Sequence, residues 1–261
     1  MDIGRLPMTS VSNDGVHIAY LDVGPRSGIP ILLVHGFAST AHVNWVFTGW
    51  VKTLVDGGYR VVALDNRGHG ESAKPHDPTL YTPDQMAGDS LAILRHLDIS
   101  QAHIMGYSMG ARLCAFLALA EPGLVQSIVL GGLGSGLVDG VGDWNLIADA
   151  LLAPSLDDVT DPKGRAFRAF ADQTGSDRRA LAACIESSRT LVARKDLARL
   201  TMPSMVAVGT KDDIAGSAEI LADMLPNGQA FEILNRDHML AVGDRTYKAA
   251  VLQFYQDHAT T

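Results

Sequence analysis

Cysteine is scarce in this chain of 261 residues, where Cys114 and Cys184 are the only two. Two thiols so far apart in the sequence fit neither a disulfide framework nor a zinc site. We interpret both as small buried residues and expect no bound metal.

Basic residues are also in the minority, with 21 Lys and Arg against 29 Asp and Glu and a formal net charge of -8. Non-specific affinity for nucleic acid comes from clustered Lys and Arg, so we expect no nucleic-acid partner. The hydrophobic fraction of 47% is typical of a globular chain that can bury a core.

Long hydrophobic runs and phosphate-binding glycine motifs are missing. The first ten residues contain no signal-like apolar run, and Leu113 to Ala120 is far too short to cross a bilayer. Neither a G-x-G-x-x-G motif nor a P-loop occurs. We therefore expect a soluble, cytoplasmic protein with no membrane partner and no cofactor.

Short apolar runs rich in β-branched residues recur along the chain, each bounded by Gly, Pro, Asn or Asp. Continuous hydrophobicity is typical of strands buried on both faces, so these runs predict a mostly parallel central sheet flanked by helices. An Asn13-Asp14-Gly15 turn adds an antiparallel hairpin before them. The runs are Ile31–Val34, Val61–Leu64, His103–Met105, Ile128–Leu130, Met205–Val208 and Phe231–Leu234.

The alternation of strand and helix stops near Gly134 and resumes at Pro203. Between them the apolar residues recur with helical spacing and no strand is evident. The sequence therefore predicts an α/β core domain of residues 1–133 and 201–261, interrupted by a helical insertion of residues 134–200.

A G-x-S-x-G motif at residues 106–110 lies between a predicted strand and a predicted helix. A chain that leaves a buried strand and turns at once into a helix strains its central residue, and only glycines fit two positions either side. This context predicts Ser108 as a nucleophile on a sharp turn.

A serine nucleophile needs a base, and the base needs an acid to orient it. His238 follows the last predicted strand, where a loop at the carboxyl edge of the sheet can reach Ser108. Asp212 follows the strand before it and is our first candidate for the acid; Asp213 is the next and Asp139 a distant third. The order Ser, Asp, His is typical of such a triad.

Two backbone N–H groups are predicted to stabilise the oxyanion. The N–H of Met109 lies at the positive end of the helix that follows Ser108, and that of Phe37 lies in the His35-Gly36-Phe37 loop after an earlier strand. Trp45, Trp144 and Met239 are candidates for an apolar substrate pocket, although such residues are more often simple core.

Together these segments resemble the α/β-hydrolase superfamily over nearly the whole chain outside the insertion. The residues that carry the resemblance are His35-Gly36, the D-x-R-G-H-G-x-S segment at 65–72, the turn at 106–110, and the loops of Asp212 and His238. The resemblance implies the α/β-hydrolase fold, with residues 134–200 as a helical cap over the pocket. It also implies that His69 is structural and lies away from the nucleophile.

The resemblance further implies a cofactor-free serine hydrolase that acts on a small ester-like molecule. We expect cleavage of a carboxylic ester or lactone through an acyl-enzyme on Ser108, a reaction of class EC 3.1.1. A carbon–carbon bond hydrolase, a thioesterase or a perhydrolase would use the same triad, and a hydrolase-like small-molecule receptor is an alternative of another class. The oligomeric state is left open by the sequence.

Overall fold

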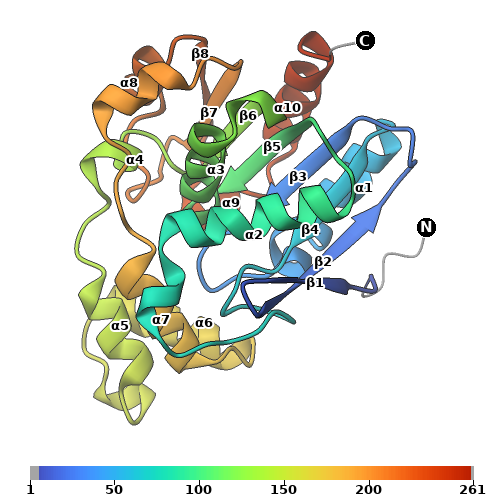
Figure 1. Ribbon diagram of the computed structural model, residues 1–261. Coiled ribbons are helices and arrows are strands. Elements are labelled where there is room, and N and C mark those ends of the chain that lie inside the picture. Colours follow the sequence, from blue (N-terminus) through green and yellow to red (C-terminus); the bar gives the residue numbers. More distant parts are fainter. Residues whose placement is uncertain (1–5, 260–261) are drawn as a thin grey trace.

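A computed structural model describes residues 6–259 and shows a single mixed sheet at the centre of the molecule (Figure 1). The strand order is β1-β2-β4-β3-β5-β6-β7-β8. The first hairpin is antiparallel, β2 pairs antiparallel with β4, and the strands from β3 onward are parallel, which confirms the predicted fold class. The strands are β1 (Thr9–Asn13), β2 (Val16–Val23), β3 (Pro30–Val34), β4 (Arg60–Leu64), β5 (Ala102–Tyr107), β6 (Val125–Gly131), β7 (Ser204–Gly209) and β8 (Gly228–Ile233).

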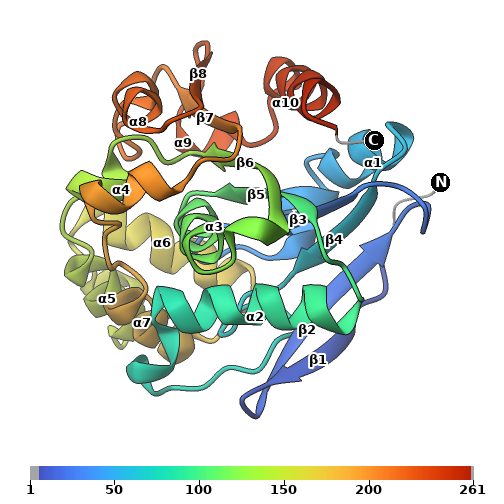
Figure 2. The ribbon, with the colours of Figure 1, turned by 45° about the horizontal axis from the view of Figure 1, so that its top comes forward.

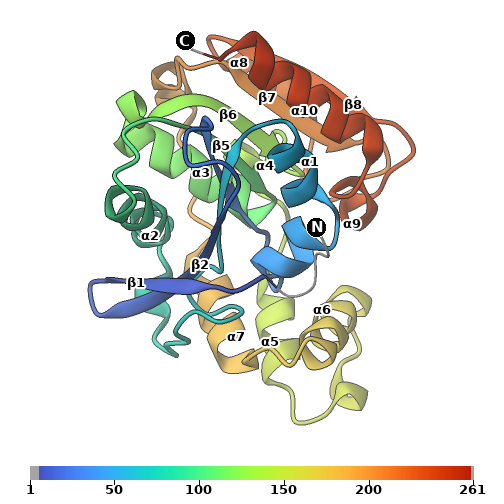
Figure 3. The same cartoon turned by 90° about the vertical axis from the view of Figure 1, so that its right-hand side faces the viewer.

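Helices cover both faces of the sheet (Figure 3). Along β3, Leu32 and Val34 pack into the core on one face, whereas Ile31 and Leu33 pack into the core on the other. Successive side chains of a strand point to opposite faces, so burial on both explains why the run is apolar throughout. The first face carries α2 (Pro83–His96), α3 (Met109–Ala120) and α8 (Ala218–Met224), and the second carries α1 (Trp50–Asp56) and α10 (Arg245–Asp257).

The last strand differs from its prediction as a fully buried run. β8 lies at the edge of the sheet, between α8 and α10 as Figure 2 shows, and pairs only with β7. Most of its residues are exposed or half-buried, Ile233 is buried, and the following Leu234 is 68% exposed. An edge strand has solvent along one side, so it is apolar at fewer positions than the central strands.

Every residue from 134 to 200 is described, and none of them is in a strand. Asp161 and Asp177 cap the helices that follow them by accepting backbone N–H groups, and Pro162 occupies a first-turn position. Figure 1 shows the longer helices of this segment grouped together beside the sheet. The helices are α4 (Gly136–Asp139), α5 (Asn145–Leu152), α6 (Pro162–Gln173) and α7 (Arg178–Ser187), with 3-10 turns at Leu156–Asp158 and Arg194–Arg199.

The described part of the chain lacks two features that would bear on function. No helix within residues 6–259 has both the length and the apolarity to cross a bilayer. The same residues contain no cluster of three or more His, Cys, Asp or Glu side chains placed to hold a metal ion.

Candidate active site

Ser108 sits on a strained turn between β5 and α3, with φ of 54° and ψ of -113°. Neither flanking glycine leaves room for a side chain. A Cβ on Gly106 would lie 2.2 Å from the backbone of Gly110, and a Cβ on Gly110 would lie 2.0 Å from the carbonyl oxygen of Val34. The turn therefore presents the serine hydroxyl at the carboxyl edge of the sheet at a cost in backbone strain.

His238 and Asp212 reach this hydroxyl from two further strand ends. His238 begins the short helix α9 (His238–Ala241) after β8, and Asp212 follows β7. The Nε2 atom of His238 lies 3.0 Å from the Oγ of Ser108, and its Nδ1 lies 2.7 Å from the Oδ2 of Asp212. The structure thus brings the three predicted side chains into one hydrogen-bonded line.

Asp212 is the carboxylate in contact with the imidazole, and the other two candidates are not. Burial acts to raise its pKa, but the hydrogen bonds from His238 and from the Ile214 and Ala215 N–H groups outweigh burial, so the net pKa lies below the usual value. Asp213 is exposed, and Asp139 pairs with Arg194 instead. An ionised Asp212 favours the imidazole tautomer with its proton on Nδ1, which leaves Nε2 free to accept a proton from Ser108.

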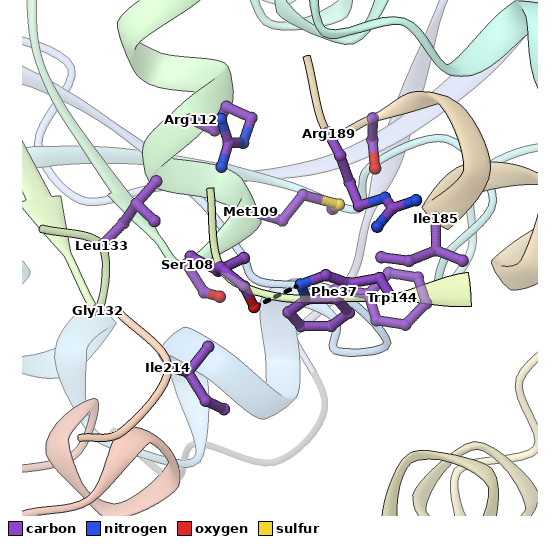
Figure 4. A pocket seen from close by; sticks show the side chains of 12 residues that line it. Phe37, Ser108, Met109, Arg112, Gly132, Leu133, Trp144, Ile185, Arg189 and Ile214 are labelled. Carbon is purple, nitrogen blue, oxygen red and sulfur yellow. Dashed lines mark hydrogen bonds between the residues drawn. The ribbon is translucent and has the colours of Figure 1, made fainter. Parts of the chain in front are cut away.

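The predicted oxyanion donors come from two different segments near Ser108. Met109 is the first residue of α3, so its N–H has no acceptor within the helix. Phe37 lies in the loop after β3, and in Figure 4 its backbone nitrogen faces the Ser108 hydroxyl. Both N–H groups are candidate donors to a carbonyl oxygen that Ser108 would attack.

The loop that carries Phe37 is held by two buried histidines. His69 Nε2 accepts the Ala38 N–H at 3.1 Å, and His35 Nε2 accepts the Asn66 N–H at 2.9 Å. Burial lowers the pKa of His35 to about 4, and burial followed by the nearby His35 lowers that of His69 to about 3. Both rings are neutral acceptors at neutral pH. His69 is structural, as predicted, but it supports the Phe37 loop and is not remote from the nucleophile.

Two pockets meet at Ser108. The larger encloses about 650 Å³, is mostly apolar, and is lined by Trp144 and Met239 as predicted, together with Phe167 and Phe170 of α6. The smaller encloses about 40 Å³ and is drawn in Figure 4. Residues of the helical segment 134–200 contribute to both.

Trp45 does not line either pocket, which corrects its prediction as a substrate contact. Its side chain is fully buried in the core on the α1 side of the sheet, with its ring centroid 6.2 Å from that of Trp50. The sequence offered no means to separate a core tryptophan from a pocket tryptophan, because both lie in apolar surroundings.

Two further residues of the site were missed. The Tyr107 hydroxyl donates to the carbonyl oxygen of His238 at 2.6 Å and so fixes the start of α9. Arg112 lies one helical turn after Ser108 and lines the smaller pocket. It is the only charged residue of α3, an otherwise apolar helix, and that exception was a signal that could have singled it out.

Comparison with known proteins agrees with the observed fold. Residues 29–153 match the family described as the alpha/beta hydrolase fold. This match over just under half of the chain, together with the observed fold, supports the α/β-hydrolase superfamily. An esterase from Rhodococcus has a similar structure with a TM-score of 0.73 and 25% identity, covering 97% of this chain and 99% of that one. A meta-cleavage product hydrolase from Pseudomonas fluorescens has a TM-score of 0.77 at 24% identity, covering 96% and 98%, and shows the likeness of fold.

Several curated relatives match about half of this chain. A non-heme chloroperoxidase from Streptomyces lividans is 37% identical over 123 residues, which are 47% of this chain and 43% of that protein. The chain thus spans less than half the length of that relative.

Proposed function

We propose that this protein is a cofactor-independent serine hydrolase that cleaves a carboxylic ester or lactone through an acyl-enzyme on Ser108. The observation that carries the proposal is the continuous line of hydrogen bonds from Asp212 through His238 to Ser108, with the serine on a strained turn. The likeness to the Rhodococcus esterase adds support for ester chemistry.

In the first half of the reaction, Ser108 Oγ attacks the carbonyl carbon while His238 Nε2 takes the hydroxyl proton. Negative charge moves to the carbonyl oxygen, which the N–H groups of Phe37 and Met109 stabilise. His238 then gives its proton to the leaving alcohol oxygen as the carbon–oxygen bond breaks. In the second half, His238 deprotonates a water that attacks the acyl carbon, and the Ser108 oxygen leaves with the returned proton.

Residues 134–200 are proposed as the cap of this enzyme, with residues 1–133 and 201–261 as its catalytic core. The segment supplies Trp144, Lys163 and the α6 aromatics to the large pocket and Ile185 to the small one. An enclosure of this kind sets which acyl and alcohol groups reach Ser108, while the core supplies the chemistry.

A fluorophosphonate probe and a panel of substrates test the proposal. We expect rapid labelling that is lost in Ser108→Ala and retained in Ser187→Ala, a matched change at the end of α7 outside both pockets. We also expect Ser108-dependent hydrolysis of p-nitrophenyl esters or a lactone.

Other outcomes of the panel assign the protein differently. Turnover of an acyl thioester in place of esters would indicate a thioesterase. Turnover of a substrate with a scissile carbon–carbon bond would indicate a carbon–carbon bond hydrolase. A folded protein that neither takes the label nor turns over any substrate would overturn catalysis and favour a receptor.

A further inference from the structure

The charged side chains around the two pockets have the opposite sign to the chain as a whole. The formal net charge is -8. Apart from His238, however, the charged residues that line the pockets are Arg112, Lys163 and Arg189, and none of the carboxylates within residues 6–259 lines either one. The site is thus locally cationic in an acidic protein.

Arg112 differs from the other buried arginines in having no carboxylate partner. Arg67 is 2% exposed and pairs with Asp89, and Arg168 is 4% exposed and pairs with Asp172. Arg112 is also 4% exposed, yet no Asp or Glu in the described part of the chain forms an ion pair with it. A buried charge without a counter-charge is costly, so an anion at this position would be strongly favoured.

Hydrogen bonds hold the guanidinium group of Arg112 in place but do not use all of its N–H donors. It donates to the carbonyl oxygens of Leu137, Thr190 and Gly136 at 3.2, 3.1 and 3.2 Å. A guanidinium has five N–H donors, so three bonds to the protein leave two available. Burial, and after it the charge of Arg189, lowers the pKa of Arg112 to about 10, so the group is still protonated at neutral pH.

Arg189 supplies a second cation to the same small pocket. It donates to the side-chain oxygen of Asn145 at 3.1 Å, while its buried Nε has no hydrogen-bond partner. Figure 4 shows both arginines at the pocket that contains Ser108, with Met109 labelled between them. The Ser188 hydroxyl lines the same pocket. Two guanidinium groups and a hydroxyl around a narrow space match the acceptor oxygens of a carboxylate.

We propose that the small pocket binds a carboxylate carried on a short acyl group of the substrate. The inference rests on the proposed ester hydrolysis for its account of the acyl group, but the anion site itself does not depend on it. The substrate class is then a half ester of a short dicarboxylic acid, with its carboxylate between Arg112 and Arg189, its carbonyl at Ser108, and an apolar alcohol part in the large pocket.

A binding experiment tests the site without requiring turnover. In the Ser108→Ala background, calorimetry would compare monobenzyl glutarate with its analogue in which the free carboxylate is a primary amide. We expect the carboxylate to bind about 10- to 100-fold more tightly, as charged hydrogen bonds allow, and Arg189→Met to remove most of that difference. Arg179→Met, an exposed arginine of α7 outside both pockets, makes the same change in net charge and should leave it intact.

Three results would overturn the anion site. They are equal affinity for the two ligands, an equal effect of Arg189→Met on both of them, and an effect of Arg179→Met as large as that of Arg189→Met. The second of these would assign Arg189 to support of the fold, because a structural role does not distinguish a carboxylate from an amide.

A kinetic experiment with Ser108 present separates the two proposals. We expect kcat/KM for the half ester to exceed that for the amide analogue by about 10- to 100-fold, and Arg189→Met to reduce this ratio toward one. Selective binding with no Ser108-dependent turnover of any ester would refute the hydrolysis and leave the anion site standing. Ester turnover at equal kcat/KM for both substrates would refute the anion site and leave the hydrolysis standing.

Discussion

Replacing Asp212 by Asn alters the triad with very little change in shape. Oδ1 of Asp212 accepts the N–H groups of Ile214 and Ala215 at 2.9 and 3.0 Å, and Oδ2 faces His238 Nδ1 at 2.7 Å. An asparagine that keeps its amide oxygen on the two backbone groups presents its NH₂ group to the imidazole. Because an NH₂ group donates, His238 Nδ1 must accept and its proton moves to Nε2.

The consequence falls on Ser108, which lies 3.0 Å from Nε2. A protonated Nε2 donates to the hydroxyl and cannot take its proton, so the base is lost while every side chain stays in place. A triad altered in this way loses about 10⁴ in kcat. That loss corresponds to about 5 kcal/mol of transition-state stabilisation. We expect the stability of the folded protein to change little, because the hydrogen bonds from the two backbone N–H groups persist.

The measurement is kcat on a short-chain aryl ester, normalised by active-site titration, with thermal unfolding as the test of folding. Asp213→Asn is the matched control, because it removes the same charge from the neighbouring exposed residue. A folded Asp212→Asn protein that keeps more than about a tenth of the normal kcat would refute the assigned role of the carboxylate, as would an equal loss in Asp213→Asn.

Two further perturbations follow from the supporting structure. Gly106→Ala places a methyl group 2.2 Å from the backbone of Gly110, so it should destabilise the protein by roughly 2 kcal/mol or more and abolish activity. Gly123→Ala is the control, because its methyl group meets no atom within 4 Å. Urea unfolding should show almost no change in stability for that variant. His35 and His69 have folded pKa values of about 4 and about 3, below the ordinary 6.5, so unfolding takes up protons below pH 6.5. The free energy of unfolding should therefore fall by about 1.4 kcal/mol per pH unit for each ring between pH 6.5 and about 4, and a flat profile there would contradict neutral buried imidazoles.

The sharp turn that carries Ser108 was predictable because its signal is local. The strand before Ser108, the helix after it and the two glycines lie within one continuous segment, and their spacing follows from steric contacts within that segment. The strands were predictable for the same reason, since burial on both faces is visible in each apolar run. The edge position of β8 was not, because it depends on which strands lie beside it in the sheet.

The contacts that support the site could not be predicted from the sequence. His69 reaches Ala38 across 31 positions, and Tyr107 reaches His238 across 131. No periodicity in the sequence encodes such pairs. The two tryptophans Trp45 and Trp144 show the same limit. Both are buried in the core, but Trp144 also lines both pockets and Trp45 lines neither.

The net charge of a chain can argue against binding of nucleic acid and still give no sign of a site for a small carboxylate. A net charge of -8 disfavours binding of nucleic acid, because such a long polyanion contacts an extended surface. A small carboxylate meets only the groups within a few ångströms, and Arg112, Lys163 and Arg189 come from three distant segments that the fold brings to two adjoining pockets. These near charges dominate the local potential, while solvent and salt screen the exposed acids elsewhere. An acidic protein can therefore select an anionic substrate, and its surface charge should affect the rate of encounter more than the affinity at Ser108.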